Sequence, residues 1–321
     1  PACSEARNNG GRMDPSPAFA TDTLSKVFPG GTTALDRLTV TVPRGSVGLV
    51  GANGAGKTTL FRLLLGLIRP TSGAVDVCGR AVADDPVGVR SRLGFMPEHD
   101  CLPPDQTAAD VVATFGELSG LPPRAARQRA SDVLDLVGLD EARFRPIEGF
   151  STGMRQRTKL AQALVADPEL VLLDEPTAGL DPMGRQEMLA LVARLGTFGI
   201  SVILATHLLD DVQAVCDHVV MIDAGQLVLA GPTAQLLERA GTIRVDVGGV
   251  NGALVDALQR RGFASVVLED ASVEITMDGR PGDEVLDVVR DVVAELELPL
   301  HALSTRHTSL DEVFLRRAGE Q

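Results

Sequence analysis

Residues 51–59 read G-A-N-G-A-G-K-T-T, a loop that satisfies the phosphate-binding pattern G-x-x-x-x-G-K-[ST]. Residues 46–50 before it are typical of a strand, and residues 58–67 after it are typical of a helix. The glycines let consecutive backbone N–H groups point into one concavity, and the helix N-terminus adds partial positive charge. The loop therefore predicts a site for nucleotide phosphates, in which Lys57 reaches the β- and γ-phosphates and Thr58 binds Mg²⁺.

A second motif lies further along the chain, where residues 170–176 read L-V-L-L-D-E-P. Its continuous apolar run is typical of a strand in the middle of a parallel sheet. A strand that ends in two acids is often only solvated at that end, but downstream of a phosphate-binding loop the pair predicts chemistry. We expect Asp174 to hold Mg²⁺ and Glu175 to polarise an attacking water molecule.

The order of the remaining elements predicts an α/β fold. Residues 84–105 are rich in proline and are expected to be mostly loop. Because strands and helices alternate, we predict a P-loop NTPase core in which the helices of about residues 96–165 form an inserted lobe. Beyond the strands already named, this core has expected strands at residues 39–42 and 201–205 and expected helices at residues 107–118 and 124–137.

A change in composition near residues 231–232 indicates a second, smaller domain over residues 240–321. The order β-α-β-β-α-β predicts a ferredoxin-like α+β unit. It contains no cluster of metal ligands or nucleophiles, so we interpret it as an accessory, dimerising module, with a purely stabilising appendage as the alternative. Its expected strands are residues 243–247, 266–268, 273–277 and 300–303, and its expected helices are residues 254–261 and 284–296.

Composition restricts the partners that the chain can have. A length of 321 residues with 44% hydrophobic residues allows two domains with a buried core. The formal net charge of −13 argues against a nucleic-acid partner, but a phosphate site depends on local backbone donors rather than on net charge. No apolar run reaches the roughly 18–20 residues of a membrane span. The four cysteines lack a C-x-x-C pair, which argues against a disulfide framework or a zinc site. The polar residues 1–18 are interpreted as a flexible leader.

Between the two motifs, residues 150–156 read F-S-T-G-M-R-Q. With this segment, roughly residues 20–236 resemble the nucleotide-binding subunit of ABC transporters. In that family two cassettes face each other head to tail, and each ATP lies between the phosphate loop of one and the signature segment of the other. Ser151 and Gly153 match the family's S-G-G-Q signature, whereas Thr152 and Met154 depart from it. Without the family, the segment is an ordinary helix cap.

Four further positions acquire a role from this resemblance. His207 matches the family's switch histidine, which contacts the γ-phosphate. Asp181 matches the aspartate of the loop that crosses the dimer interface. Phe28 stands where the family places a ring against adenine, although it is otherwise a plain core residue. Glu98 replaces a usual glutamine; we hypothesise that it contacts Mg²⁺ and water and senses the membrane partner, the alternative being a loop cap.

The resemblance thus implies a complete ATP site. Its catalytic residues are Glu175, His207, Glu98 and Lys57, and its Mg²⁺ ligands are Thr58, Asp174 and Glu98. The residues expected to bind ATP are Phe28, Gly51, Ala52, Asn53, Gly54, Ala55, Gly56, Lys57, Thr58, Thr59, Ser151, Thr152, Gly153, Met154 and Asp181.

By the same resemblance, residues 19–236 form an ATPase domain that powers transport through a separate integral-membrane permease subunit. It would act with a second copy of itself, peripherally at the cytoplasmic face of the cell membrane. Residues 308–319, T-S-L-D-E-V-F-L-R-R-A-G, resemble the tail of ABC-2 cassettes that export drugs and antibiotics, so we expect a drug, antibiotic or lipid-like cargo.

Two other classes of function remain as alternatives. The first is a soluble non-transport ABC-type ATPase, but the repair and chromosome members of that class carry long coiled coils, and this chain shows no sustained heptads. The second is a GTPase, which is disfavoured because no N-K-x-D guanine-recognition motif occurs in the sequence.

Overall fold

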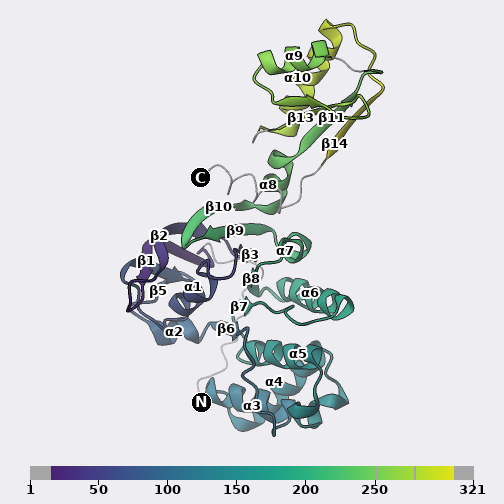
Figure 1. The fold of residues 1–321 in the computed structure, drawn as a ribbon. Helices are drawn as coiled ribbons and strands as arrows, with labels where there is room; N and C mark the ends of the chain where they lie inside the picture. Colours follow the sequence, from purple (N-terminus) through teal and green to yellow (C-terminus); the bar gives the residue numbers. More distant parts are fainter. Residues whose placement is uncertain (1–15, 250–251, 278–279, 307–321) are drawn as a thin grey trace.

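The core of the protein is a six-stranded sheet, and the computed structural model describes residues 16–249, 252–277 and 280–306 (Figure 1). Neighbouring strands of this sheet are parallel except β9 and β10, which are antiparallel. The arrangement confirms the P-loop α/β core that the sequence predicts. In spatial order the strands are β10 (Gln226–Pro232), β9 (His218–Asp223), β3 (Ser46–Val50), β8 (Ser201–Thr206), β7 (Leu170–Asp174) and β6 (Leu93–Met96).

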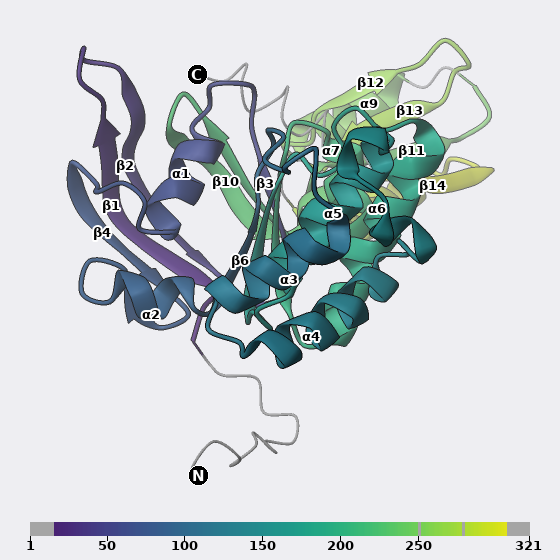
Figure 2. The ribbon, with the colours of Figure 1, turned by 90° about the horizontal axis from the view of Figure 1, so that it is seen from below.

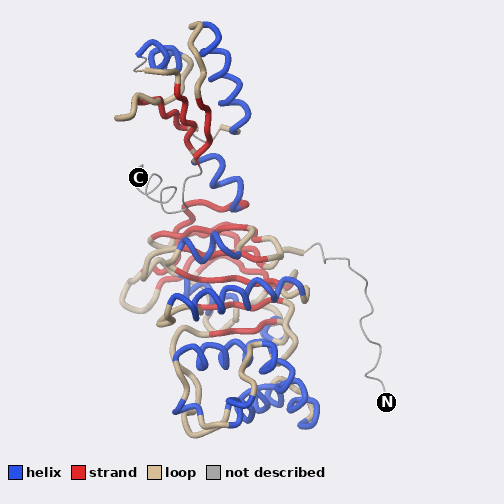
Figure 3. The backbone as a smooth tube through the Cα atoms, turned by 90° about the vertical axis from the view of Figure 1, so that its right-hand side faces the viewer, coloured by secondary structure: helices blue, strands red, loops and turns tan. Residues whose placement is uncertain are grey.

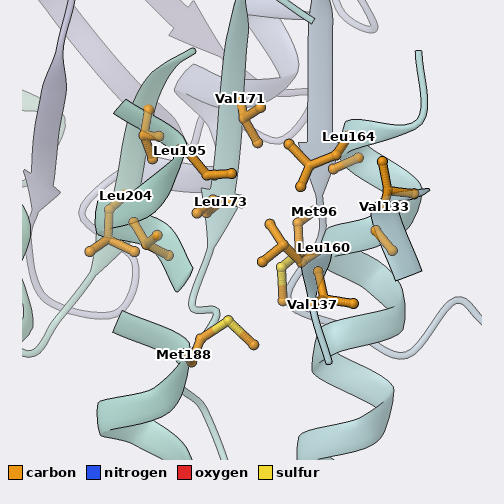
Figure 4. Close-up of a cluster of buried hydrophobic side chains, with 14 of the residues drawn as sticks. Met96, Val133, Val137, Leu160, Leu164, Val171, Leu173, Met188, Leu195 and Leu204 are labelled. Atoms are coloured by element: carbon orange, nitrogen blue, oxygen red, sulfur yellow. The ribbon is translucent and has the colours of Figure 1, made fainter. Parts of the chain in front are cut away.

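The central strands β7 and β8 are buried over their whole length. Both faces of the sheet are covered, which is why these strands are continuous apolar runs rather than alternating ones. On one face they pack against α5 (Thr152–Leu164) and α6 (Pro182–Thr197). Leu160 of α5, Leu173 of β7 and Leu204 of β8 belong to one buried cluster (Figure 4). Burial of this apolar surface is the main stabilising contribution to the core.

A second sheet, antiparallel and four-stranded, lies on the side of the core away from α5 and α6 (Figure 2). Helix α1 (Lys57–Leu64) packs with both sheets, because Leu60 and Phe61 of α1 share a buried cluster with Phe19 of the second sheet and Leu172 of β7. The predicted strand at residues 39–42 belongs to this second sheet. Its strands are β2 (Thr33–Val42), β1 (Phe19–Val27), β4 (Ser72–Val77) and β5 (Arg80–Ala81).

The helices predicted between the motifs form a lobe at one end of the core, opposite the small C-terminal unit (Figure 3). The Thr107 side chain caps the first of these helices by accepting a hydrogen bond from the backbone N–H of Asp110. The elements of the lobe are α3 (Ala108–Leu118), α4 (Pro123–Leu136), the 3₁₀ turns Glu141–Phe144 and Ile147–Gly149, and α5.

The expectation of loop over most of residues 84–105 is wrong in one important part. The structure places α2 (Pro86–Arg90) and strand β6 there, and β6 pairs with β7 from Leu93 opposite Leu170 to Met96 opposite Leu173. A four-residue strand that contains Gly94 carries little local signal, because glycine weakens strands and the segment is too short for a period. It becomes a strand only through its pairing with β7.

The C-terminal unit follows α8 (Thr233–Ala240), which is preceded in the chain by α7 (Leu209–Val215) and the β9–β10 hairpin. Its four-stranded antiparallel sheet has the order β12-β13-β11-β14. This is the β-α-β-β-α-β element order predicted from the sequence, with the last strand displaced by a few residues. Its elements are β11 (Thr242–Asp246), α9 (Gly252–Arg260), β12 (Ser265–Val267), β13 (Val273–Thr276), α10 (Gly282–Glu295) and β14 (Ala302–Arg306).

Two sequence expectations lie outside the described residues: most of the leader, at residues 1–15, and the export-type tail at residues 308–319. None of the helices in the described part of the chain combines the length and the hydrophobicity that a membrane crossing requires.

Candidate functional site

The phosphate-binding loop joins the carboxyl end of β3 to α1. Gly56 has φ +109, and a Cβ atom there would lie 2.6 Å from the carbonyl oxygen of Ala34, so only glycine fits. Lys57 begins α1 and is 6% exposed. Its Nζ donates to the carbonyl oxygens of Gly51 at 2.6 Å and Ala52 at 3.3 Å. The loop thus holds its own lysine within the concavity that the sequence predicts for phosphates.

Asp174 ends β7 beside this loop. Because the carboxyl ends of parallel strands meet at one edge of a sheet, the ends of β3 and β7 lie close together. Thr58 Oγ1 donates to Asp174 Oδ2 at 3.0 Å, although the two residues are far apart in the chain. A hydroxyl and a carboxylate oxygen thus sit together at the edge of the loop, and both are oxygen ligands of the kind that Mg²⁺ prefers.

Glu175 follows directly and has φ +49, a left-handed backbone conformation that is unfavourable for a glutamate. The surrounding contacts hold it there. Its Oε1 lies 2.9 Å from Nδ1 of His207 and 3.9 Å from Nζ of Lys57. Thr206 Oγ1 donates to its Oε2 at 3.3 Å. Glu175 is only 6% exposed, so its carboxylate is fixed between the lysine and the histidine.

Burial shifts the pKa values of Lys57 and Asp174 in this site. It lowers the pKa of Lys57, and the nearby carboxylates of Glu175, Asp174 and Glu98 oppose that change. Burial also raises the pKa of Asp174, against the hydrogen bond from Thr58, and the negative charges of Glu98 and Glu175 raise it further. Three carboxylates therefore lie near Lys57, and a divalent cation bound among them would stabilise their ionised forms.

A cavity of about 340 Å³ opens at this edge of the sheet, and we call it the phosphate-loop cavity. It brings together most of the predicted phosphate, metal and catalytic residues, and it adds two alanines that the sequence reasoning missed because an alanine carries no chemical signal. The lining residues are Ala34, Ala52, Asn53, Gly54, Gly56, Lys57, Thr58, Thr59, Glu98, Asp174, Glu175, Ala178 and His207.

The predicted signature residues lie instead in a second cavity of about 540 Å³, with Asp181 and its neighbours. Ser151 Oγ accepts a hydrogen bond from the Met154 N–H at 3.3 Å and thereby caps α5. Asp181 Oδ1 accepts one from the Gly184 N–H at 2.8 Å and caps α6. The cap reading of the signature therefore holds for Ser151. Each cap also leaves a helix N-terminus, with its partial positive charge, at this second cavity.

Three predicted ATP-binding residues line neither cavity. Gly51 and Ala55 are buried within the loop itself. Phe28 is half-buried, and Nζ of Lys26 lies 5.3 Å from the centroid of its ring. Contact of Phe28 with adenine stays a prediction.

The sequence reasoning missed a buried polar contact beside the site. Asp211 on α7 is fully buried and accepts hydrogen bonds from Thr177 Oγ1 at 2.6 Å and from Arg185 Nε. It ties the segment after Glu175 to the helix after His207. A lone aspartate on a predicted helix would be taken as solvated, so no local signal reveals this role.

The oxygen ligands that this chain supplies fit a magnesium ion only together with a substrate. Among the described residues no group of three or more His, Cys, Asp and Glu side chains could hold a metal ion alone. Mg²⁺ needs no such cage, because it commonly binds through one or two protein oxygens, water and substrate phosphates. Thr58 and Asp174, 3.0 Å apart beside the phosphate loop, meet that requirement.

The parallel sheet, the glycine-rich loop at its edge and the acidic strand end beside the loop define a P-loop nucleotide-binding protein. A family model described as "ABC transporter" matches residues 35–178. The chain is 35% identical to the "Daunorubicin resistance ATP-binding protein DrrA3" of Streptomyces coeruleorubidus, over 89% of this chain and 92% of that one. The chain therefore belongs to the ABC transporter family, as one of its ATPase cassettes.

Two further similarities agree with this assignment. The "Nod factor export ATP-binding protein I" of Ralstonia nicotianae is 32% identical, with 95% of each chain covered. A solved structure of cbiO1 from Clostridium perfringens, described as part of the ABC transporter complex cbiONQ, matches with a TM-score of 0.61 and 28% identity. That match covers 68% of this chain and 89% of the other.

Proposed function

We propose that this chain hydrolyses ATP to power the export of a drug, antibiotic or lipid-like compound through a separate membrane subunit. The observation that carries the proposal is the convergence of Lys57, Asp174 and Glu175 on one cavity at the edge of the parallel sheet. Relatives named for daunorubicin resistance and for Nod factor export support the direction and the class of cargo.

We assign the residues of the phosphate-loop cavity as follows. Lys57 and the loop amides bind the phosphates of ATP. Glu175 accepts a proton from the attacking water, because its carboxylate is fixed within the cavity. His207 orients Glu175 at 2.9 Å and contacts the γ-phosphate. Thr58 and Asp174 hold Mg²⁺, which supplies neutralisation of the charge on the β- and γ-phosphates when it is bound.

We further propose that a second copy of the chain completes each ATP site. The predicted signature residues, Ser151 to Met154, line a different cavity from the phosphate loop, so one chain does not bring the two halves together. Head-to-tail pairing would place the α5 N-terminus of one copy against the phosphates held by the other, where its partial positive charge is favourable. Thr152 and Met154 then alter side-chain contacts, while the backbone donors remain.

Recovery of the chain in the membrane fraction tests its proposed association with a permease subunit. We propose peripheral binding at the cytoplasmic face of the cell membrane, so the full chain should sediment with membranes only when its permease is present. The measurement is fractionation of cells with and without the permease gene, followed by ATP hydrolysis by the purified chain. Recovery with ribosomes or nucleoid in both strains would favour the alternative, a non-transport ABC ATPase.

Glu98→Gln tests the proposed role of Glu98 toward Mg²⁺. The exposed Glu98 side chain lines the phosphate-loop cavity, and an amide is a weaker ligand than a carboxylate. We expect near wild-type kcat at saturating Mg²⁺, with the half-saturating Mg²⁺ concentration raised about tenfold. The measurement is steady-state ATP hydrolysis with Mg²⁺ titrated at fixed ATP. An unchanged titration would indicate that Glu98 only caps its loop.

We propose that residues 240–321 form a dimerising or regulatory unit. Its core is separate, because the buried residues of β11, β13, α9 and α10 form a cluster of their own. Helix α8 belongs instead with the ATPase core: Thr233 Oγ1 donates to the Cys216 carbonyl at 2.8 Å, and Leu236 packs on the core. Deletion of residues 242–321 should therefore weaken ATP-driven dimerisation, measured by analytical ultracentrifugation. Unchanged dimerisation would leave only a stabilising appendage.

A further inference from the structure

A buried lysine on α5 holds the loop that carries Glu98. Lys159 is 3% exposed, and its Nζ donates to the carbonyl oxygens of Pro97 at 2.8 Å, Glu98 at 2.9 Å and His99 at 3.5 Å. An ammonium group has three N–H donors, so three consecutive carbonyls match its capacity. Burial of a charged amine is unfavourable unless such acceptors are present. The loop backbone therefore curls around this one group.

The choice of lysine at this position is itself informative. Only three of the chain's 30 Lys and Arg residues are lysines: Lys26, Lys57 and Lys159. The other basic residues are arginines, and arginines also form the buried or partly buried ion pairs on α5 and α6. A planar guanidinium presents a flat fork of donors, whereas three carbonyls that converge on one point require a compact ammonium group. The geometry of the loop accounts for the lysine.

The base of the same loop is also fixed against α5. Gly94 in β6 lies so close to this helix that a Cβ atom would come within 2.1 Å of the Ala163 carbonyl oxygen. Met96 at the end of β6 and Leu160 of α5 pack in one buried cluster (Figure 4). The loop that follows Met96 thus starts from a strand that cannot shift relative to the helix without losing this packing.

Helix α5 links this loop to the second cavity. The helix begins at Thr152, directly after Ser151, and Thr152 to Met154 line that cavity. One turn before Lys159, the side chain of Gln156 donates to the carbonyl oxygen of Ala178 at 3.1 Å. Gln156 thus contacts Ala178, and Lys159 contacts Glu98. Both Ala178 and Glu98 line the phosphate-loop cavity, so α5 contacts two segments of its wall.

We propose that Lys159 is a positioning residue, whose ammonium group sets the backbone of residues 97–99 so that the Glu98 carboxylate faces the phosphate-loop cavity. Through this contact a shift of the signature segment at the start of α5 moves Glu98 as well. The inference rests on the proposed ATPase function and on the proposed role of Glu98 toward Mg²⁺.

A double-mutant cycle on the full chain tests this proposal. The variants are Lys159→Met, Glu98→Gln and the double variant, assayed for ATP hydrolysis with Mg²⁺ titrated at fixed ATP. Lys159→Met should raise the half-saturating Mg²⁺ concentration about tenfold. In the Glu98→Gln background the same substitution should add less than about a twofold change, because both act through one side chain. Lys159→Arg keeps the positive charge, but a planar guanidinium does not match three converging carbonyls, so we expect a shift in the same direction that is smaller than that of Lys159→Met.

Two controls separate positioning from simple destabilisation. Thr158→Val removes another buried hydrogen bond of α5, from Thr158 Oγ1 to the Met154 carbonyl at 2.8 Å, without touching the loop. It should leave the Mg²⁺ titration at its wild-type position. Glu175→Gln reports on the ATPase function itself. Two results would overturn the positioning role: the effects of the Lys159 and Glu98 substitutions multiply independently, or neither Lys159 variant shifts the Mg²⁺ titration. If hydrolysis still depends on Glu175 in either case, the ATPase function stands.

Discussion

Glu175→Gln is expected to lower kcat for ATP hydrolysis by a factor of at least about 10² while ATP still binds. Glutamine keeps the size of the side chain and accepts from Thr206, but it cannot take a proton from water. The backbone at residue 175 already has φ +49, so an isosteric change adds no new strain. The substitution leaves the proposed phosphate contacts of Lys57 and the loop amides unchanged, so ATP should remain bound at the proposed site between two copies.

The measurement for this variant is steady-state hydrolysis together with equilibrium binding of a fluorescent ATP analogue. Glu117→Gln, on an exposed glutamate of α3, is the matched control and should hydrolyse ATP at the wild-type rate. Hydrolysis by Glu175→Gln at more than about a tenth of the wild-type rate would mean that another group acts as the base.

Gly94→Ala is expected to reduce the free energy of unfolding by about 3 kcal/mol. The added Cβ atom would lie 2.1 Å from the backbone oxygen of Ala163 and 3.3 Å from Cγ of Pro168. A backbone atom cannot move away as the tip of a side chain can, so β6 and α5 must separate. Because β6 leads into the Glu98 loop, the remaining folded protein should also require more Mg²⁺.

Chemical denaturation of the full chain measures this loss, with Gly196→Ala as its control. Gly196 lies in α6, where an added Cβ atom meets nothing within 4 Å, and alanine favours a helix by up to about 1 kcal/mol over glycine. The control should be neutral or stabilising. A Gly94→Ala midpoint equal to that of wild type would show that α5 can move away from β6 at little cost.

Some parts of the fold and site could be predicted because their signals are local. The phosphate loop is one contiguous segment, and the structure has the predicted strand before it and the predicted helix after it. Strand β7 is buried on both faces, so its sequence is a continuous apolar run that can be recognised by composition. Strand β6 gave no such signal, because its four residues include Gly94 and become a strand only through pairing with β7.

Contacts between distant segments were not predictable in the same way. Asp211, Gln156 and Lys159 are polar residues on helices, and a sequence pattern assigns such residues to the solvated face. Their burial became visible only when loops far away in the chain were found to supply hydrogen-bond partners. The predicted ATP-binding residues are divided between two cavities. The family resemblance implied this division, but no spacing in the sequence required it.

The sequence alone determined the chemistry of the phosphate-loop cavity. Two acids at a strand end are often only solvated, but downstream of a glycine-rich phosphate loop they indicate chemistry, and a parallel sheet brings such strand ends to one edge. The tertiary structure alone decided how Glu98 is held. The amine of Lys159 meets three carbonyls some 60 residues earlier in the chain. Such a contact depends on the close packing of β6 against α5, and packing between distant segments leaves no period or motif in the sequence.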